Sequence, residues 1–586
     1  MSKFDFSVDR LDDKLKALKS KNTNISLLRI VVFFGLIGTG VLFLSEHAVW
    51  GLVLAFLAWA FVRLINVYNF HKDQEAIYLG LRKLNDEIQA QKLRQLQDLD
   101  PGVEFLDKKH PFANDLDLFG EHSLFQLINH TVSEEGKGKL AEQLKSDFDL
   151  EEAAKKREAI DELAQKNDFL AAMGSIGKAF YKEGNPSGWQ GWLGTEEKIK
   201  SWIWPFAILG PVGGLGLSVA VYLGFLPASF LGIWILLGLG FLGAVFSALK
   251  KAGDEIPSRE ELKTYRYWME VLDGQTFQSE TLRAAIEPLQ VESEKAYKLL
   301  AQLDSFGLWV QNRINILYIP VNLLFWTDLL LYLRLIAWKN RFGKQLASFP
   351  DALSSWEVWY SLGIFQSELG AQGEVSAVEK GISGTAISHP LLSPEVAIPN
   401  DFLQSKDDQV ILLTGANMSG KTTFMRTLGV NCVLTNLGLR PFAKAFGFAN
   451  FQLYTSMRNS DNLGESVSSF YAELSRIKQL IDRAEKGEEI FFLLDEILKG
   501  TNTEDRIAGS EALIRQVLET EAMGIISTHD IELAELEKRI PAVRNYSFHS
   551  EVLDQTINFD YKIKNGPCPS FNAHKLMELM GIRFRG

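Results

Sequence analysis

A phosphate-binding loop is the stretch of this sequence whose chemistry is clearest. Residues 410–413 are an apolar run typical of a strand, and a glycine-containing loop then leads into a helix-like segment. Gly415, Gly420, Lys421 and Thr422 have the spacing of the P-loop pattern G-x-x-x-x-G-K-[ST]. The glycines let backbone N–H groups face phosphates, the lysine reaches the terminal phosphates, and the threonine hydroxyl binds Mg²⁺. The alternative is a chance glycine turn, and the flanking strand and helix argue against it.

Two carboxylates and a histidine follow later apolar runs. Asp495 and Glu496 end FFLLDE (491–496), and His529 follows the run in IISTHD (525–530). Ligands of open α/β sheets bind at the carboxyl ends of strands. We therefore predict that Asp495 binds Mg²⁺, that Glu496 orients or deprotonates a water, and that His529 senses the γ-phosphate. The plainer alternatives are solvated acids at a strand end and a structural histidine.

Two loops complete the expected site. Ser468 and Ser469 lie where a Gly/Ser loop enters a helix within 460–480, and they resemble a cap with exposed N–H groups. A plain capped helix is the alternative. LKGTNTEDR (498–506) suggests a loop that meets a neighbouring subunit, although alone it would be an ordinary turn. The constellation predicts an ATPase that converts ATP and water to ADP and phosphate, with ATP and Mg²⁺ bound.

Composition limits the class of protein. A length of 586 residues indicates several domains. The net charge of −12 argues against a chain that coats nucleic acid by bulk charge. Cys432 and Cys568 are the two cysteines, which is too few for a disulfide framework or a metal cluster and fits a reducing compartment.

Two long apolar blocks are typical of membrane-spanning hairpins. In the first, residues 30–62, the titratable residues are Glu46 and His47, which lie midway. The second, residues 201–249, has no charged residue or histidine, and GFLPAS (224–229) marks its turn. Each arm approaches the ~20 residues that a spanning helix needs. A buried helix pair in a soluble protein is the alternative, but such helices rarely stay apolar all round.

Lysine and arginine flank both blocks on their outer ends and are missing from the connecting turns. The positive-inside rule then places both termini and the P-loop in the cytoplasm. We predict a multi-pass protein of the cytoplasmic (inner) membrane, with lipid as a partner. A third apolar segment, 314–333, contains Pro320, Asn322 and Asp328. We expect a core helix there rather than a fifth span, because an Asp at mid-span is costly in lipid.

The site strings resemble those of the MutS family of ABC-type ATPases. TGANMSGKTT is similar to the family's TGPNMxGKST, with Ala416 in place of proline. SDNLGESVSSFYAEL resembles DDLxxGxSTFMVEM, LLDEILKGTNTEDR resembles LLDExGRGTSTYDG, and STHD resembles ATHY. IPNDF (398–402) resembles the segment that meets adenine. The resemblance covers residues from about 105 to the end, except 201–249, and is weaker in the helical core.

This resemblance implies an α/β P-loop ATPase domain of ABC/MutS type, preceded by an all-α core and lever domain that here has two transmembrane hairpins. It implies that nucleotide contacts are made by Gly415, Ala416, Asn417, Met418, Ser419, Gly420, Lys421, Thr422, Thr423 and Ile398. The implied catalytic residues are Glu496, His529 and Lys421, and the implied Mg²⁺ ligands are Thr422 and Asp495. A homodimer through the ATPase domain would place the partner's γ-phosphate against Ser468 and Ser469.

The expected organisation follows the chain in order: tail 1–24, hairpin 25–69, helical core 70–200, hairpin 201–249, lever and core 250–385, and ATPase domain 386–586. The first hundred residues hold too little chain for the family's mismatch-recognition domain. We therefore predict a membrane-anchored variant that drives lever movement with ATP.

The resemblance also implies DNA binding and a role of the mismatch-repair type. Local phosphate contacts could come from Arg313, Arg334, Lys339, Arg341 and Lys344, although a solvated basic helix edge explains them as well. Three alternatives stay open: an ABC-type transporter, an ATPase of a membrane process with no DNA role, and a nucleotide switch that does not hydrolyse ATP.

Overall fold

The computed structural model describes residues 6–45, 49–182, 189–291, 294–316, 318–370, 372–458, 469–553 and 556–569. Their contacts divide the chain into two units. Unit 1 comprises Met1–Asp86, His130–Gly136 and Lys166–Tyr360, and unit 2 comprises Glu87–Asn129, Lys137–Gln165 and Ser361–Gly586. The units interleave along the sequence, whereas the boundaries expected above follow one another.

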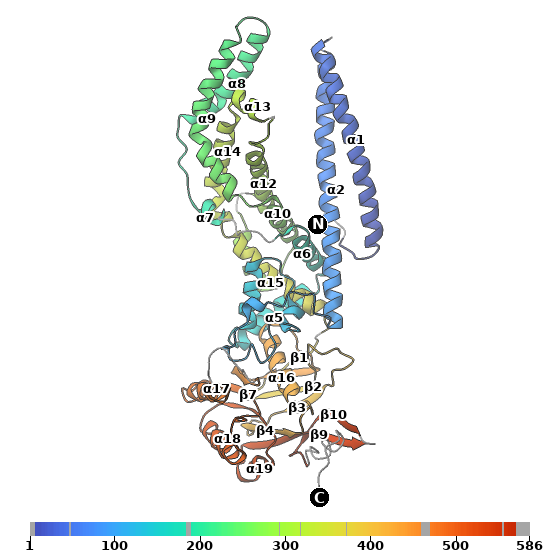
Figure 1. The fold of residues 1–586 in the computed structure, drawn as a ribbon, viewed down its shortest axis with the longest axis vertical. Coiled ribbons are helices and arrows are strands. Elements are labelled where there is room, and N and C mark those ends of the chain that lie inside the picture. The colour runs from blue at the N-terminus through green and yellow to red at the C-terminus, as the bar shows by residue number, and fades with distance from the viewer. Residues whose placement is uncertain are drawn as a thin grey trace. The chain divides into compact units, whose positions relative to one another are not determined.

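The first two helices lie side by side as an antiparallel pair (Figure 1): α1 (Leu11–Ser45) and α2 (Trp50–Leu93). The rings of Phe33 and Phe61 are 6.2 Å apart in the apolar part, and Asn22 donates to Glu75 at 2.9 Å in the polar part. Several charged residues of the expected tail lie in the first turns of α1, namely Asp12, Asp13, Lys14, Lys16, Lys19 and Lys21. No glycine or proline interrupts residues 11–34, so nothing in the sequence stops the helix there.

The other helices that lie wholly or mostly in unit 1 are α6 (Asn167–Phe180), α7 (Trp189–Gly194), α8 (Ile203–Tyr222), α9 (Ser229–Glu255), α10 (Arg259–Asp273), α11 (Glu280–Ile286), the 3₁₀ helix η2 (Glu287–Leu289), α12 (Ala296–Asn312), α13 (Tyr318–Phe325), α14 (Thr327–Leu346) and α15 (Phe349–Glu368). Helix α10 packs on α6 and α12. Its Trp268 is fully buried and donates its indole N–H to the carbonyl of Met173 at 2.7 Å.

Four described helices are long and apolar enough to cross a membrane: α1, α2, α8 and α9. The most apolar windows of α1 and α2 contain no buried residue, and those of α8 and α9 are 22% and 17% buried. These pairs lie where we expected the two hairpins, although α2 continues to Leu93, well beyond the expected end at residue 69.

The prediction of a single core helix over 314–333 is wrong. The chain breaks at Trp326, whose φ of 52° is left-handed, and α13 and α14 meet there at 86°. Helix α13 has no buried residue, whereas α14 buries Asp328, which is 3% exposed. The aspartate stays inside because it pairs with Arg313 at 2.9 Å.

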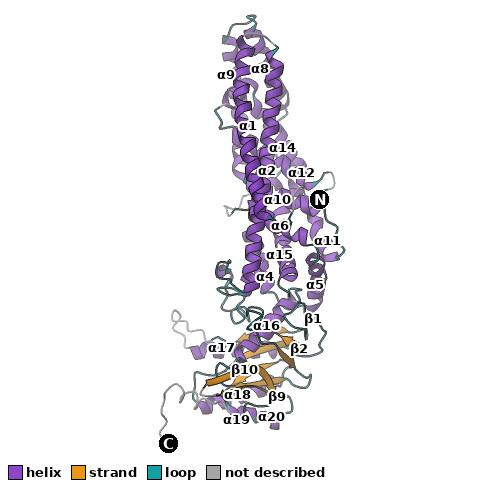
Figure 2. Ribbon diagram, turned by 90° about the vertical axis from the view of Figure 1, so that its right-hand side faces the viewer, coloured by secondary structure: helices purple, strands orange, loops and turns teal. Residues whose placement is uncertain are grey.

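Unit 2 combines short helices with two sheets (Figure 2). Helices that begin before the sheets are η1 (Val103–Phe105), α3 (Leu124–Ile128), α4 (Glu134–Leu144) and α5 (Leu150–Ala164). A four-stranded sheet has the order β1-β5-β2-β3, formed by β1 (Glu374–Val375), β2 (Ile382–Ile387), β3 (Asn400–Leu403) and β5 (Ala445–Phe448). Strands β1 and β2 thus begin before residue 386, where we expected the α/β domain to start.

The larger sheet has the order β10-β9-β4-β8-β7-β6 and is parallel except for the β9–β10 pair. Its strands are β4 (Val410–Gly415), β6 (Gln452–Ser456), β7 (Ile490–Asp495), β8 (Met523–Thr528), β9 (Val543–Leu553) and β10 (Thr556–Asn565). The associated helices are α16 (Lys421–Asn436), α17 (Ser469–Ala484), α18 (Thr503–Val517), α19 (Ile531–Ala534) and α20 (Leu536–Arg539).

Side chains alternate between the two faces of this sheet. Val410 and Leu412 pack in one cluster with residues of α17, α18, α19 and α20. Leu493 of β7 faces Gly429 of α16 instead. Because both faces are covered, β4, β7 and β8 read in the sequence as continuous apolar runs.

Two alanine substitutions are expected to change stability in opposite directions. A Cβ at Gly524 in β8 would lie 2.1 Å from the carbonyl oxygen of Phe492, so Gly524→Ala should lower the free energy of unfolding by about 1–3 kcal/mol. A Cβ at Gly138 in α4 would meet nothing within 4 Å, so Gly138→Ala should raise it by about 0.5–1 kcal/mol. Thermal unfolding in detergent compares the two variants, and a stabilised Gly524→Ala protein would contradict the packing at β8.

Candidate functional site

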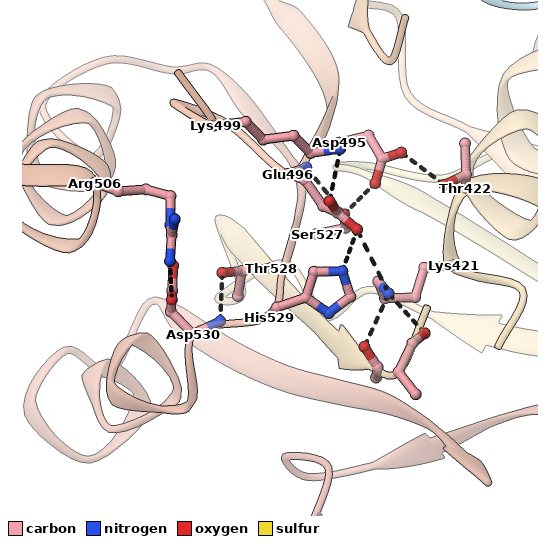
Figure 3. Close-up of polar contacts among 12 residues, drawn as sticks. Lys421, Thr422, Asp495, Glu496, Lys499, Arg506, Ser527, Thr528, His529 and Asp530 are labelled. Carbon is pink, nitrogen blue, oxygen red and sulfur yellow. Dashed lines mark hydrogen bonds and ion pairs between the residues drawn. The ribbon is translucent and has the colours of Figure 1, made fainter. Parts of the chain in front are cut away.

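The P-loop connects the carboxyl end of β4 to the start of α16. Gly420 precedes α16 with φ 105°, and Met418 has φ 66° and is 80% exposed. A Cβ at Gly415 would lie 2.8 Å from the carbonyl oxygen of Phe548, so this turn requires glycine. Lys421 is 4% exposed and donates to the carbonyls of Gly415 at 2.9 Å and Ala416 at 3.0 Å (Figure 3).

These residues fit a nucleotide's phosphates. Burial lowers the pKa of Lys421, although Glu496 and Asp495 oppose the shift, so an anionic ligand would stabilise the ammonium. The hydroxyl of Ser419 is buried and has no hydrogen-bond partner. Buried polar groups without partners are costly, and a phosphate oxygen would supply an acceptor.

Thr422 and Asp495 meet as predicted for a Mg²⁺ site. The Thr422 hydroxyl donates to Asp495 Oδ2 at 2.6 Å, and the Ser527 hydroxyl donates to Asp495 Oδ1. Hydroxyl and carboxylate oxygens are the hard ligands that Mg²⁺ prefers. Within the described ranges, no group of three or more His, Cys, Asp or Glu could hold a metal. An ion between Thr422 and Asp495 would therefore take its other ligands from phosphate and water.

Glu496 lies directly after β7 in a left-handed conformation, with φ 49°. Its backbone N–H donates to the Ser527 carbonyl at 3.1 Å, which fixes the carboxylate at the end of the sheet. His529 contacts Glu496 Oε1, Lys499 Nζ lies 2.6 Å from Oε2, and Lys421 Nζ lies 4.0 Å from Oε1.

The charge of Glu496 is set by these neighbours. Burial by itself would raise the pKa of this carboxyl, but the contacts with His529 and Lys499 outweigh burial and lower it to about 2. The group is therefore ionised at neutral pH. A base with so low a pKa takes up a proton weakly, so this state suits an acceptor that orients water.

For the remaining predicted residues, the structure gives a position in the chain but fewer contacts with the site. Asn417 and Thr423 lie in the loop and in the first turn of α16. Ile398 is 39% exposed, and the Asn400 side-chain amide donates to the carbonyls of both Ile398 and Tyr561, at 3.2 and 3.0 Å. Ser469 begins α17, and Ser468 lies outside the described residues.

Four contributors escaped the sequence analysis. Ser527 and Lys499 contact the two carboxylates, and Glu473 of α17 accepts a hydrogen bond from the Leu498 backbone N–H. The Tyr561 ring lies against the P-loop, because a Cβ at Gly420 would be 3.1 Å from its Cδ1. Three of them had a signal in the sequence, because Ser527, Lys499 and Glu473 lie within the strings STHD, LKGTNTEDR and SDNLGESVSSFYAEL.

The loop of β4, the acids of β7 and the histidine after β8 therefore meet at the carboxyl ends of adjacent strands, with Asp495 paired to Ser527 in register. Residues 411–582 match the family model described as MutS domain V. This C-terminal stretch is therefore similar to MutS domain V. The matched stretch contains every catalytic and metal-binding residue predicted above.

Curated relatives support the same assignment. The chain is 33% identical over 187 residues to the DNA mismatch repair protein MutS of Aquifex pyrophilus, an alignment that covers 32% of this chain and 22% of that protein. The Bacillus subtilis (strain 168) protein of the same name is 34% identical over 189 residues, or 31% of this chain and 22% of the relative. The chain thus spans less than a quarter of the length of these MutS proteins.

A buried histidine that precedes the matched stretch should make stability depend on pH. Burial, with smaller contributions from Arg426 and His122, lowers the pKa of His389 to about 4. Below the ordinary pKa of about 6.5, the histidine is protonated in the unfolded chain but stays neutral in the folded chain. The free energy of unfolding therefore decreases as the pH falls from about 6.5 towards 4. We expect a loss of about 2 kcal/mol between pH 7 and 5.

Thermal unfolding across this pH range measures the effect, with His389→Asn as the comparison. Asparagine keeps an acceptor for the Leu391 backbone N–H, which donates to His389 Nδ1 at 3.2 Å, but it does not titrate. As the pH falls from 7 to 5, the free energy of unfolding of the wild-type protein should decrease by about 2 kcal/mol relative to that of the variant. Parallel curves would show that His389 is not the titrating group.

Proposed function

We propose that this protein is a membrane-anchored MutS-like ATPase that binds and hydrolyses Mg·ATP at sites completed by dimerisation. The observation that supports it best is the meeting of Lys421, Thr422, Asp495, Glu496 and His529 at one sheet edge. A chance P-loop would not place two carboxylates and a histidine from other strands beside it.

Each group of the β4, β7 and β8 strand ends has a role that its position supports. Lys421 binds the terminal phosphates with its ammonium, and the glycine loop supplies backbone N–H groups. Thr422 and Asp495 hold Mg²⁺, which when bound neutralises charge on the phosphates. Glu496 orients the attacking water, and His529 and Lys499 hold the carboxylate in place. Ser468 and Ser469 reach the partner's γ-phosphate, as the family resemblance implies.

The apolar helices support anchoring in the cytoplasmic membrane with the termini and the ATPase domain in the cytoplasm. Side chains such as Phe34, Leu52 and Trp59 are 60% or more exposed on α1 and α2. Such large apolar surfaces are rare on soluble monomers. Lipid is the partner that covers surfaces of this kind along whole helices.

A role in DNA binding receives less support from the basic residues of α12–α14. Arg313 pairs with buried Asp328, and Lys339 is 1% exposed and pairs with Glu197 at 2.5 Å. These two cations are therefore engaged inside the protein rather than offered to phosphates. This observation favours the second candidate, an ATPase of a membrane process with no DNA role.

Two assays separate these proposals. The detergent-purified chain should release phosphate from ATP with Mg²⁺ and stop when EDTA removes the ion, because one carboxylate and one hydroxyl leave most ligands to phosphate and water. Mobility shifts on homoduplex, mismatched and branched DNA across a salt series test DNA binding, since phosphate contacts weaken steeply with salt. Failure to bind any of them at low salt would reject the DNA role and leave the ATPase proposal intact.

A further inference from the structure

Helix α13 is an apolar surface element that the ATPase proposal does not use. Residues 314–327 include no charged side chain. Ile314 is 91% exposed and Ile316 is 81% exposed, while Ile319 and Val321 are 48% and 43% exposed. Exposure of this kind would be costly in water, so the face needs a partner.

The neighbours of α13 are the two helices of the second apolar hairpin. Helix α13 contacts both α8 and α9, and Figure 1 shows it beside α8. A Cβ at Gly214 of α8 would lie 2.2 Å from the carbonyl oxygen of Leu324, and one at Gly238 of α9 would lie 2.1 Å from Trp326 Nε1. The end of α13 is therefore packed directly on the backbones of the hairpin.

The contact between the end of α13 and helix α8 lies well inside α8, away from its first residue. Gly210 and Gly214 are about 10–16 Å from Ile203 along α8, at 1.5 Å per residue. That distance is close to half of a hydrocarbon core about 30 Å thick. If α8 spans the bilayer, the break at Trp326 lies near its middle.

Both flanks of the segment return to the same end of the hairpin. A Cβ at Gly253 of α9, just beyond Lys250 and Lys251, would be 3.0 Å from Val310 of α12. A Cβ at Gly343 of α14 would be 2.5 Å from the carbonyl oxygen of Leu193, which precedes α8. The chain therefore runs along the hairpin through α12 and α13 and returns through α14 to the end of the hairpin from which it started.

The broken backbone at Trp326 is satisfied from within the protein, as hydrocarbon demands. The Trp234 indole N–H donates to the Leu324 carbonyl at 2.8 Å, and the two indole rings of Trp234 and Trp326 stack at 4.2 Å. The Asp328 backbone N–H donates to the Asn322 side chain at 2.9 Å.

The one acidic group near the break is also neutralised internally. Asp328 accepts from Arg313 Nε and from the Tyr318 hydroxyl, both at 2.9 Å. Its side chain is 4% exposed and that of Arg313 is 12% exposed. A buried, paired aspartate is compatible with membrane depth, whereas an unpaired one facing lipid is not.

We propose that residues 314–316 and 318–326 belong to a re-entrant membrane segment whose exposed apolar face contacts lipid acyl chains. The segment enters beside α8–α9 from the cytoplasmic side, turns at Trp326 and leaves as α14. The number of complete spans stays at four. This inference rests on the proposed insertion of α8–α9, and the positive ends of that hairpin set its side.

Site-specific fluorescence in proteoliposomes tests the contact with lipid. Single cysteines at Ile316 and Val321 carry an environment-sensitive dye, and the chain is reconstituted in phosphatidylcholine–phosphatidylglycerol vesicles. Leu237 of α9 (55% exposed) serves as the hairpin reference and Val396 of unit 2 (69% exposed) as the aqueous reference. Cys432 and Cys568 are both buried, so the unsubstituted chain gives the labelling background.

Doxyl-labelled phospholipid should quench the dye at 316 and 321 as strongly as at 237, and aqueous iodide should quench it only at 396. Iodide quenching at 316 and 321, with lipid quenching at 237, would overturn the re-entrant segment alone. Protection from both quenchers would also overturn it, because a second protein copy would then cover α13. Iodide quenching at 237 would show instead that the hairpin itself is outside the membrane.

Discussion

Replacing Glu496 by glutamine should slow phosphate release by a factor of about 10² to 10⁴ while ATP still binds. Glutamine keeps the length and shape of the side chain but carries no charge. It cannot orient water as a charged acceptor, and it loses its attraction to Lys499 at 2.6 Å and Lys421 at 4.0 Å. Phosphate release at saturating Mg·ATP measures the rate, and a fluorescent nucleotide measures binding separately.

The matched control for this variant is Glu519→Gln. Glu519 is exposed in the turn after α18, outside the loop expected to meet a neighbouring subunit, and undergoes the same chemical change. It should release phosphate at the wild-type rate. Equal rates for wild type and Glu496→Gln would remove Glu496 from the mechanism and favour a nucleotide switch that does not depend on this carboxylate.

Replacing Lys421 by alanine should weaken ATP binding by about 3 kcal/mol, or roughly 100-fold in Kd. The ammonium is buried in the P-loop, and two backbone carbonyls at 2.9 and 3.0 Å already fix its position. Phosphate oxygens would replace these weaker partners with charged ones. Alanine removes the charge where the terminal phosphates are expected.

Nucleotide titration of Lys421→Ala beside Lys486→Ala checks this result. Lys486 is exposed in the turn after α17, so its loss should leave Kd unchanged. An unchanged Kd in Lys421→Ala would mean that the loop does not hold phosphate through this side chain. Loss of binding in both variants would point to the overall charge rather than to the site.

The sequence by itself identified most of the residues that meet at the candidate site. Local strings carry this information, because the P-loop turn needs Gly415 and Gly420 at fixed spacing, and covered parallel strands must be apolar. The predicted Mg²⁺ ligands Thr422 and Asp495 lie 2.6 Å apart, and the predicted catalytic residues Lys421 and Glu496 lie 4.0 Å apart. Ser527 and Tyr561 were missed, since their contacts depend on the tertiary structure. Lys499 was missed although it lies only three residues after Glu496.

Two apolar blocks were likewise visible in the sequence, because a helix without polar residues over about 20 positions shows itself by length alone. The fate of 314–333 was not, and we predicted one core helix there. The break at Trp326 depends on glycines of α8 and α9, which let the chain approach. It also depends on Arg313, which neutralises Asp328. The sequence by itself determined which segments are apolar enough to form membrane-spanning helices. Tertiary contacts decided where the backbone could bend and where a charged side chain could be buried.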